Sequence, residues 1–356
     1  MSAPRPAKGL LATCVASLAL VVACGGGGPS SAVSGSPSVS GAASTAASAS
    51  TQKSLKTVNV LTDITLSGVH APLFAGKAQG FFAQQGIDLQ IHAGSGSADS
   101  AAKVGAGAAD FAIADTAAAL QTLNKGAKLT LVGAVEQKNP GGLCTIESRH
   151  KITSFADLKG LSIGASPGDA YLVPLPYMME KAGATATYKS VSMTPADRIP
   201  ALLSGKVDAV ACGHHGLPSY QAAAKKQGLT LDEFAYADHG FDALGWAIIT
   251  RTDLVKGDPQ LVQGFVTALV KSYDYSVKDP SAAVADFVKA NPEQDQARAL
   301  EEWKDEIPLL KDDSGKMFGS GRFDATIAFV NDAYKTHLSV KDVYTSTFIG
   351  KALAGS

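Results

Sequence analysis

Polar side chains that could hold a small molecule gather at a few loops of this largely apolar chain. Carboxylates, hydroxyls and imidazoles follow short β-rich runs and precede amphipathic helical stretches. In open α/β sheets these strand-to-helix loops form the ligand crevice, because the first backbone N–H groups of the following helix are unpaired and point outward. We therefore expect a crevice lined by residues 62–70, 94–97, 115–116, 166–171, 193–194 and 213–215.

The types of these side chains indicate which ligand they suit. The candidates for ligand contact are Asp63, Ser67, Ser95, Ser97, Asp115, Thr116, Ser166, Gly168, Asp169, Tyr171, His214, Asp238 and Phe241. Several are carboxylates and none is an arginine, which disfavours a sulfonate or nitrate because such anions favour a guanidinium or ammonium partner. Helix N-termini alone can hold an anion, so that alternative stays open. Carboxylates suit the amino groups of a nitrogenous heterocycle.

Aromatic rings near these loops could stack on such a heterocycle. Tyr171, Phe241 and Trp246 are the rings in question, because stacking supplies a large apolar contact of defined geometry. Core packing is the alternative for Trp246, which begins a strand-like run. Asp169 also has a structural alternative, since an acid in the first turn of a helix complements the helix dipole.

Sequence motifs for nucleotide and metal chemistry are missing. The chain has no Walker loop and no His/Cys cluster spaced for a metal. His214, His215 and His239 are not spaced as a tetrahedral metal set. We therefore expect no catalytic residue, no metal and no cofactor. The 31 basic and 32 acidic residues nearly cancel, which disfavours nucleic acid as a partner.

The first residues predict export and lipid anchoring. Arg5 and Lys8 precede an uncharged apolar stretch, 10–23, which is too short to cross a membrane comfortably and ends directly before Cys24. We expect residues 1–23 to be a lipoprotein signal peptide and Cys24 to carry the lipid. An ordinary signal peptide with an incidental cysteine is the alternative. Residues 24–55 are almost wholly small or polar and predict a flexible tether.

After the tether, β-rich runs alternate with helical stretches, which predicts an α/β fold with parallel sheets. A first series gives strands at 58–61, 87–92, 111–114 and 129–135 and helices at 70–85, 98–104 and 116–124. A second gives strands at 144–147, 161–165, 188–191 and 207–211 and helices at 155–158, 170–181 and 196–203. The remainder is mostly helical, at 259–278, 281–289, 293–305 and 323–337.

One short pattern occurs in both series. Gly107-Ala108-Ala109-Asp110-Phe111-Ala112-Ile113 matches Gly205-Lys206-Val207-Asp208-Ala209-Val210-Ala211 in its helix end, glycine, aspartate and buried strand. The match indicates a duplicated unit. The alternative is that helix-to-strand turns in general favour glycine and aspartate.

Several further stretches, each weak alone, occur in order along the chain. They are His70-Ala71-Pro72-Leu73-Phe74-Ala75, Gly80-Phe81-Phe82, Gly86-Ile87-Asp88-Leu89, the segment 154–164 and Val343-Tyr344-Thr345. Together with the two Gly–Asp segments they resemble the bacterial solute-binding proteins for sulfonates, nitrate, taurine and thiamine-pyrimidine precursors. The resemblance extends over nearly the whole chain after the tether.

The resemblance implies a two-lobe, periplasmic-binding-protein-like (type II) α/β fold with two crossover strands as hinge. Lobe 1 would comprise residues 56–138 plus 246–356, and lobe 2 residues 139–245. It also implies a carrier rather than an enzyme, which closes on a small-molecule solute and presents it to an ABC permease and its ATPase. His70 stands where the pyrimidine-precursor branch places a His-Ala pair, so His70 joins the candidates for ligand contact. A helix-capping or half-buried imidazole is the alternative.

From these patterns we expect a monomer in the cell envelope, held by lipid on the outer face of the cytoplasmic membrane. Its expected solute is a nitrogenous aromatic similar to a thiamine-pyrimidine precursor. The alternatives are a sulfonate, taurine or nitrate binder of the same family, a pyrimidine-synthase-like enzyme, and a surface sensor. The eukaryotic thiamine-pyrimidine synthases resemble this chain, yet their cysteine-rich motif is missing here.

Two cysteines remain after the predicted export. Cys144 and Cys212 both lie near strands of lobe 2. In an oxidising compartment they can form a disulfide, or they can stay as two small buried thiols. The sequence leaves both open.

Overall fold

The computed structural model describes residues 54–166, 169–319 and 321–355, all of which belong to one compact unit. The predicted signal peptide, Cys24, the tether up to residue 53 and Gly168 lie outside the described residues. Within the described part, no helix combines the length and the apolar character needed to cross a membrane.

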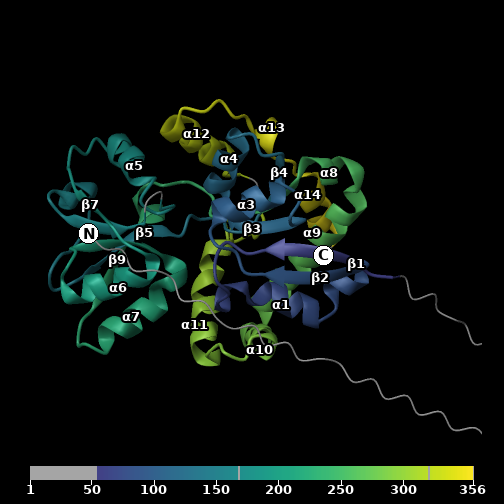
Figure 1. The fold of residues 1–356 in the computed structure, drawn as a ribbon, viewed down its shortest axis with the longest axis horizontal. Coiled ribbons are helices and arrows are strands. Elements are labelled where there is room, and N and C mark those ends of the chain that lie inside the picture. The colour runs from purple at the N-terminus through teal and green to yellow at the C-terminus, as the bar shows by residue number, and fades with distance from the viewer. Residues whose placement is uncertain (1–53, 167–168, 320, 356) are drawn as a thin grey trace, which may run out of the picture. The chain divides into compact units, whose positions relative to one another are not determined.

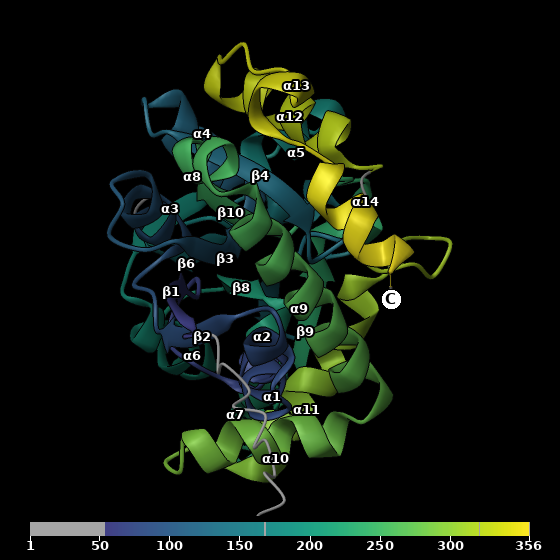
Figure 2. The same ribbon diagram turned by 90° about the vertical axis from the view of Figure 1, so that its right-hand side faces the viewer.

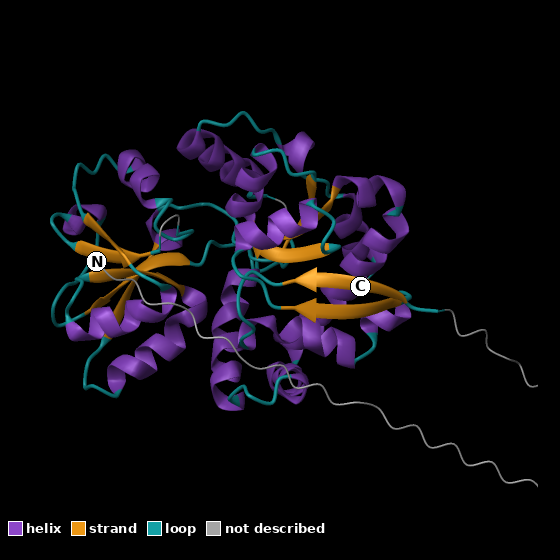
Figure 3. Ribbon diagram, viewed as in Figure 1, coloured by secondary structure: helices purple, strands orange, loops and turns teal. Residues whose placement is uncertain are grey.

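Ten strands form two sheets with the same internal order (Figures 1 and 3). The first sheet contains β1 (Lys56–Leu61), β2 (Ile87–His92), β3 (Phe111–Asp115), β4 (Leu129–Ala134) and β10 (Trp246–Arg251). The second contains β5 (Gly141–Ile146), β6 (Ser162–Ala165), β7 (Lys189–Ser192), β8 (Ala209–Gly213) and β9 (Leu231–Ala235). The strand orders are β2-β1-β3-β10-β4 and β7-β6-β8-β5-β9.

One strand in each sheet runs against its neighbours. β10 pairs antiparallel with β3 and β4, and β5 pairs antiparallel with β8 and β9, whereas the other pairings are parallel. These are the two strands that the chain enters on passing from one sheet to the other. The sheets are therefore mixed, with mainly parallel pairings and one antiparallel strand in each where the chain enters from the other sheet.

The repeated Gly–Asp segments hold equivalent places in the two sheets. Asp110, just before β3, accepts a hydrogen bond from the backbone N–H of Asn59 in β1 at 2.9 Å. Asp208, just before β8, accepts one from the N–H of Ser162 in β6 at 2.8 Å. Each acid fixes the start of a central strand against its parallel neighbour, and this equivalence supports the duplicated unit. We propose that the ranges 56–138 plus 246–356, and 139–245, are the two lobes.

Helices surround both sheets (Figure 1). The α-helices are α1 (Ala71–Ala78), α2 (Phe81–Gln84), α3 (Ser97–Gly105), α4 (Thr116–Asn124), α5 (Leu175–Lys181), α6 (Pro195–Ser204), α7 (Leu217–Lys225), α8 (Thr252–Gly257), α9 (Pro259–Lys278), α10 (Pro280–Ala290), α11 (Gln296–Glu306), α12 (Phe323–Tyr334), α13 (Val340–Val343) and α14 (Thr347–Ala354). Short 3₁₀ turns are η1 (Gly68–His70), η2 (Phe155–Leu158), η3 (His214–Gly216), η4 (Tyr236–His239) and η5 (Ile307–Leu310).

Two helices are shorter than the sequence predicts. The expected helix at 70–85 is divided because Gly80 takes the left-handed conformation, with φ 74°, and separates α1 from α2. The expected helix at 170–181 begins only at Leu175. Pro174 precedes it and disfavours helical backbone in the residue before, which leaves the segment from Ala170 as a loop.

The tail helices complete the core of the first sheet. α9 packs on α1, α10 and α14 (Figure 2). Its Phe265 stacks on Phe111 of β3 with ring centroids 3.8 Å apart. Both rings are fully buried, so burial of large apolar side chains holds the tail against the strands that carry the site.

A disulfide joins two neighbouring strands of the second sheet. Cys144 of β5 and Cys212 of β8 are bonded, with Cα atoms 5.7 Å apart. Of the two states that the sequence left open, the structure has the bridge. β8 ends at the predicted ligand loop 213–215, so the bond restrains the strand that positions this loop.

Loss of this bridge should weaken the fold. The bond closes a loop with a sequence separation of 68, and chain-entropy reasoning assigns such a loop up to about 4 kcal/mol. We expect a Cys144→Ala/Cys212→Ala variant to lose about 2–4 kcal/mol of unfolding free energy in urea titrations. A reductant should destabilise the wild type and leave the variant unchanged. Equal stability of the two proteins under oxidising conditions would contradict this role.

Candidate functional site

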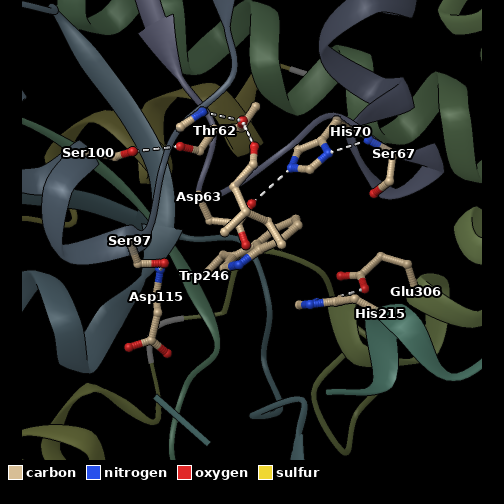
Figure 4. Close-up of polar contacts among 12 residues, drawn as sticks. Thr62, Asp63, Ser67, His70, Ser97, Ser100, Asp115, His215, Trp246 and Glu306 are labelled. Atoms are coloured by element: carbon tan, nitrogen blue, oxygen red, sulfur yellow. Dashed lines mark hydrogen bonds and ion pairs between the residues drawn. The ribbon is translucent and has the colours of Figure 1, made fainter. Parts of the chain in front are cut away.

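The site is built on the loop that follows β1, which two side chains hold in place (Figure 4). Ser100 donates a hydrogen bond from Oγ to the carbonyl of Thr62 at 2.7 Å, and Thr62 Oγ1 accepts one from the backbone N–H of Gly94 at 3.2 Å. The next residue, Asp63, is thereby fixed with its carboxylate buried.

Asp63 and His70 form a buried pair beside Trp246. His70 Nδ1 lies 3.2 Å from the backbone N–H of Ser67 and accepts its hydrogen bond. Its Nε2 lies 3.0 Å from Asp63 Oδ1. Nε2 is therefore the protonated ring nitrogen and donates a hydrogen bond to the carboxylate. The imidazole also stacks on Trp246, with centroids 5.3 Å apart. Both ring nitrogens of His70 therefore have internal partners, and the ring is held in one orientation.

A second histidine reaches the same indole from the second sheet. His215 in η3 stacks on Trp246 with centroids 4.6 Å apart. Its Nε2 lies 2.8 Å from Glu136 Oε1 and 3.2 Å from Glu306 Oε2, and its Nδ1 lies 3.4 Å from the hydroxyl of Tyr171. Figure 4 shows Trp246 between His70 and His215 in this view. We call Glu136, His215 and Glu306 the Glu–His–Glu cluster.

Burial sets the protonation chemistry of this cluster. It raises the pKa of Glu136 well above the usual range, and the neighbouring Glu306 carboxylate adds to the rise. Burial lowers the pKa of His215, but the Glu136 and Glu306 carboxylates outweigh it, so the pKa lies well above its ordinary value. A cation or a proton is thus favoured where the three side chains meet.

Backbone contacts hold the second carboxylate oxygen of Glu136, the one that does not face His215. The backbone N–H of Trp246 donates to Glu136 Oε2 at 3.0 Å. A Cβ on Gly245 would lie 1.8 Å from the same oxygen, so only glycine leaves room for the carboxylate. Glu136 follows β4 and Gly245 precedes β10, which places this contact between the two segments that connect the sheets.

Tyr171 is placed by glycines at the ends of β5 and β8. Gly141 and Gly213 pair across these strands. A Cβ on Gly213 would lie 2.5 Å from the Tyr171 ring, and one on Gly141 would lie 3.1 Å from it. The tyrosine ring therefore lies flat against the strand ends, with its hydroxyl directed to His215. Burial raises the pKa of the Tyr171 hydroxyl.

Arg198, which was not among the predicted site residues, contacts two of them. Arg198 of α6 forms an ion pair with Asp169 and donates to Ser166 Oγ at 2.9 Å and to the carbonyl of Ala211 at 3.1 Å. Asp169 also accepts from the backbone N–H of Tyr171 at 3.0 Å. The expectation that no arginine stands among the candidates is wrong, because helix α6 extends the guanidinium back to the end of β6. Asp169 is consequently neutralised internally.

A cavity of about 360 Å³ is lined by residues of both proposed lobes. Asp115 and Phe241 are the predicted residues on its wall, and Phe329 and Tyr334 of α12 add further rings. Phe241 packs edge-on against Phe329 with centroids 4.9 Å apart. The remaining lining residues are Ala98, Ala117, Ala118, Gln121, Thr122, Lys125, Asn139, Ala170, Val173 and Pro174. The cavity thus offers aromatic faces together with a few polar groups.

Asp115 supplies the carboxylate of this cavity. Its backbone N–H donates to Ser97 Oγ at 3.1 Å, and its Oδ1 accepts from the N–H of Ala118 at 2.7 Å as the N-cap of α4. Burial, with a contribution from Asp63, raises the pKa of Asp115 to about 6 despite the hydrogen bond from Ala118.

A larger hollow of about 810 Å³ lies beside β7 and α6, and its lining includes Ser166 and the predicted loop residues 193–194. Its walls come from the second sheet and its helices alone. A solute enclosed by two lobes needs walls from both sides, so we take the smaller cavity as the candidate binding site.

The other predicted residues bond to neighbouring groups or lie on the surface, and none of them lines the candidate cavity. Ser95 donates to Asp99 on the surface, and Thr116 donates to the carbonyl of Gly245 at 2.6 Å. His214 lies 3.3 Å from Glu233, whose hydrogen bond raises the pKa of the imidazole. Asp238 is exposed on η4.

The paired sheets and their two connections define the periplasmic-binding-protein-like class of fold. The chain belongs to the NMT1/THI5-like family, whose model matches residues 67–283. It is similar to the formylaminopyrimidine-binding protein of Halalkalibacterium halodurans, at 26% identity over 64% of this chain and 69% of that protein. It is also similar to 4-amino-5-hydroxymethyl-2-methylpyrimidine phosphate synthase of Candida albicans, at 24% identity over 63% of this chain and 68% of the enzyme.

A solved structure shares the fold. The periplasmic aliphatic sulphonate-binding protein SsuA of Escherichia coli superposes with a TM-score of 0.64 at 16% identity, covering 81% of this chain and 89% of that one.

Asp115→Asn should remove a pH-dependent loss of folding stability. The folded pKa of about 6 lies above the ordinary 3.8, so ionisation of Asp115 destabilises the fold, with no cost below about pH 4 and the full cost above pH 6. The shift corresponds to about 3 kcal/mol, and we expect about 1–2 kcal/mol because the residue keeps some contact with solvent. In urea unfolding, the free energy of unfolding of the variant should increase relative to that of the wild type by this amount as the pH rises from 4 to 8.

The control for that experiment is Asp253→Asn, whose side chain is 76% exposed. A stability difference between Asp115→Asn and wild type that stays constant across the pH range would contradict the assignment.

Proposed function

We propose that this protein is the solute-binding component of an ABC-type importer, and that it captures a small nitrogenous aromatic solute of the thiamine-pyrimidine kind. The cavity between elements of both sheets is the observation that carries the proposal. Its volume of about 360 Å³ falls in the range of small-molecule sites. Its combination of rings with one carboxylate suits a flat molecule that carries amino groups.

The relatives support this choice of solute. One is named for binding a formylaminopyrimidine and another for making a pyrimidine phosphate. The carboxylate of Asp115 and the amides of Gln121 and Asn139 line the wall and can accept hydrogen bonds from ring amino groups. Arg198 is engaged by Asp169, which leaves it a weak partner for a sulfonate or nitrate. Lys125, the cationic residue on the cavity wall, is exposed, so solvent weakens its pairing with such an anion.

Closure of the two lobes on the solute is the proposed mechanism. Phe241 and Ala170 belong to proposed lobe 2, whereas Asp115 and Tyr334 belong to proposed lobe 1. A solute that touches both sets stabilises the closed form by the difference in its affinity for the two forms. The permease would then recognise the closed form.

Solute binding should depend on Asp115. We expect 4-amino-5-hydroxymethyl-2-methylpyrimidine to bind the purified protein at a 1:1 ratio in isothermal titration calorimetry. Asp115→Asn should weaken binding at least about tenfold, because a hydrogen bond to a charged group contributes about 1.5–3 kcal/mol. Asp253→Asn should bind as the wild type does. Saturable binding of taurine or nitrate in place of the pyrimidine would contradict the proposed solute.

The same samples distinguish a carrier from an enzyme. Solute recovered unchanged after prolonged incubation supports transport, and multiple turnover into a new product supports the synthase alternative.

We also propose that the protein is lipid-anchored through Cys24 in the cell envelope. Cys24→Ala should prevent lipid attachment and release the protein from the membrane fraction. Intact-mass measurement and fractionation check this expectation, and an unaltered membrane association of the variant would contradict it.

A further inference from the structure

We propose that the Glu–His–Glu cluster is a binding site for a divalent transition-metal ion of the Zn²⁺ type, distinct from the aromatic cavity. One ligand atom each of Glu136, His215 and Glu306 lies within 4.8 Å of the others. An imidazole nitrogen and two carboxylate oxygens are ligands that Zn²⁺ accepts, in sites where three protein ligands leave one position open. The cluster was not visible in the sequence because its members come from three distant segments.

The spacing of the atoms suits such an ion. Ligands at about 2.0–2.1 Å in a tetrahedron stand about 3.3 Å apart. His215 Nε2 is 3.2 Å from Glu306 Oε2 and 2.8 Å from Glu136 Oε1. Both distances lie within about half an ångström of the tetrahedral value, and the two carboxylate oxygens lie within 4.8 Å of each other.

Burial of Glu306 is the second observation that points to a cation. The residue is 1% exposed. Its Oε2 lies 3.2 Å from His215 Nε2, whereas its Oε1 has no hydrogen-bond partner in the described part of the chain. A buried carboxylate oxygen without a partner is costly. A divalent ion would displace the protons that the cluster holds, and its charge would then balance the two carboxylates beside a neutral imidazole.

The surroundings of the cluster match those of a metal site. Metal-binding histidines usually direct their second ring nitrogen to an oxygen, and metal-binding carboxylates are themselves hydrogen-bonded. Here His215 directs Nδ1 to the hydroxyl of Tyr171 at 3.4 Å, which leaves Nε2 for the ion. Glu136 accepts from the N–H of Trp246 through Oε2, which leaves Oε1 for it.

A bound ion would join the two proposed lobes. His215 follows β8 of the second sheet, whereas Glu306 ends α11 and Glu136 follows β4. The metal would thus stabilise the arrangement in which η3 lies against α11, independently of any solute in the aromatic cavity.

The test is Zn²⁺ binding to tag-free, chelator-treated protein, measured by calorimetry and by elemental analysis after dialysis. We expect one Zn²⁺ per chain and a higher melting temperature with Zn²⁺, since an ion that binds only the folded state stabilises it. His215→Gln and Glu306→Gln should each weaken binding at least about tenfold. Absence of a stoichiometric site in the folded wild type would overturn the proposal.

Matched controls separate this site from adventitious binding. Glu301→Gln changes an exposed acid on the same helix α11, and His150→Gln changes a histidine paired with Asp208 on the surface. Both should keep the wild-type affinity. Equal losses in controls and cluster variants would overturn the proposal. Co²⁺ absorption in the wild type gives a readout that needs no variant, with a strong visible band expected for three protein ligands and an open position.

Pyrimidine binding by the metal-free protein is measured in the same series. The solute and metal proposals can therefore fail separately.

Discussion

The structure depends on the contact between the two segments that connect its sheets. The backbone N–H groups of Val135 and Glu136 both donate to the carbonyl of Trp246, at 2.8 and 3.1 Å, and the carboxylate of Glu136 accepts from the N–H of Trp246 in return. These bonds hold the end of β4 against the start of β10. Trp246 stacks on both imidazoles and Glu136 belongs to the Glu–His–Glu cluster, so this junction positions both features.

Charge balance explains how the surrounding acids are accommodated. Asp63 is paired with His70, Asp169 with Arg198, and Asp115 caps a helix. Each of these acids thus has a partner within the protein, which lowers the cost of burying it. Two acids, Glu136 and Glu306, share a single imidazole. Protons offset this charge, as the raised pKa values of Glu136 and His215 indicate, and the centre therefore favours a proton or a cation.

Strand ends could be predicted from the sequence because they depend on short-range patterns. Hydrophobic runs located β3 and β6, and the rule that loops at strand ends bind ligands then pointed to Asp63, Asp115 and Ser166. Two other signals were equally local. The Gly–Asp repeat occupies equivalent places in the two sheets, and the cysteine pair proved to be bridged.

The rest could not be predicted because it depends on contacts between distant segments. Glu136 and His215 are separated by 79 positions, and Glu306 belongs to a tail helix that no local pattern connects with the strand ends. Arg198 reaches the site from the second turn of a helix. The contacts of His215 could not be predicted for a different reason, since the sequence does not reveal which of two adjacent residues a short 3₁₀ turn directs inward.

Hydrogen–deuterium exchange with and without 4-amino-5-hydroxymethyl-2-methylpyrimidine tests the central claim most directly. If a solute is enclosed by both proposed lobes, the backbone at the start of α4 and the segments around Ala170 and Phe241 should become protected together. Protection confined to elements of one sheet, or no protection at saturating solute, would contradict it.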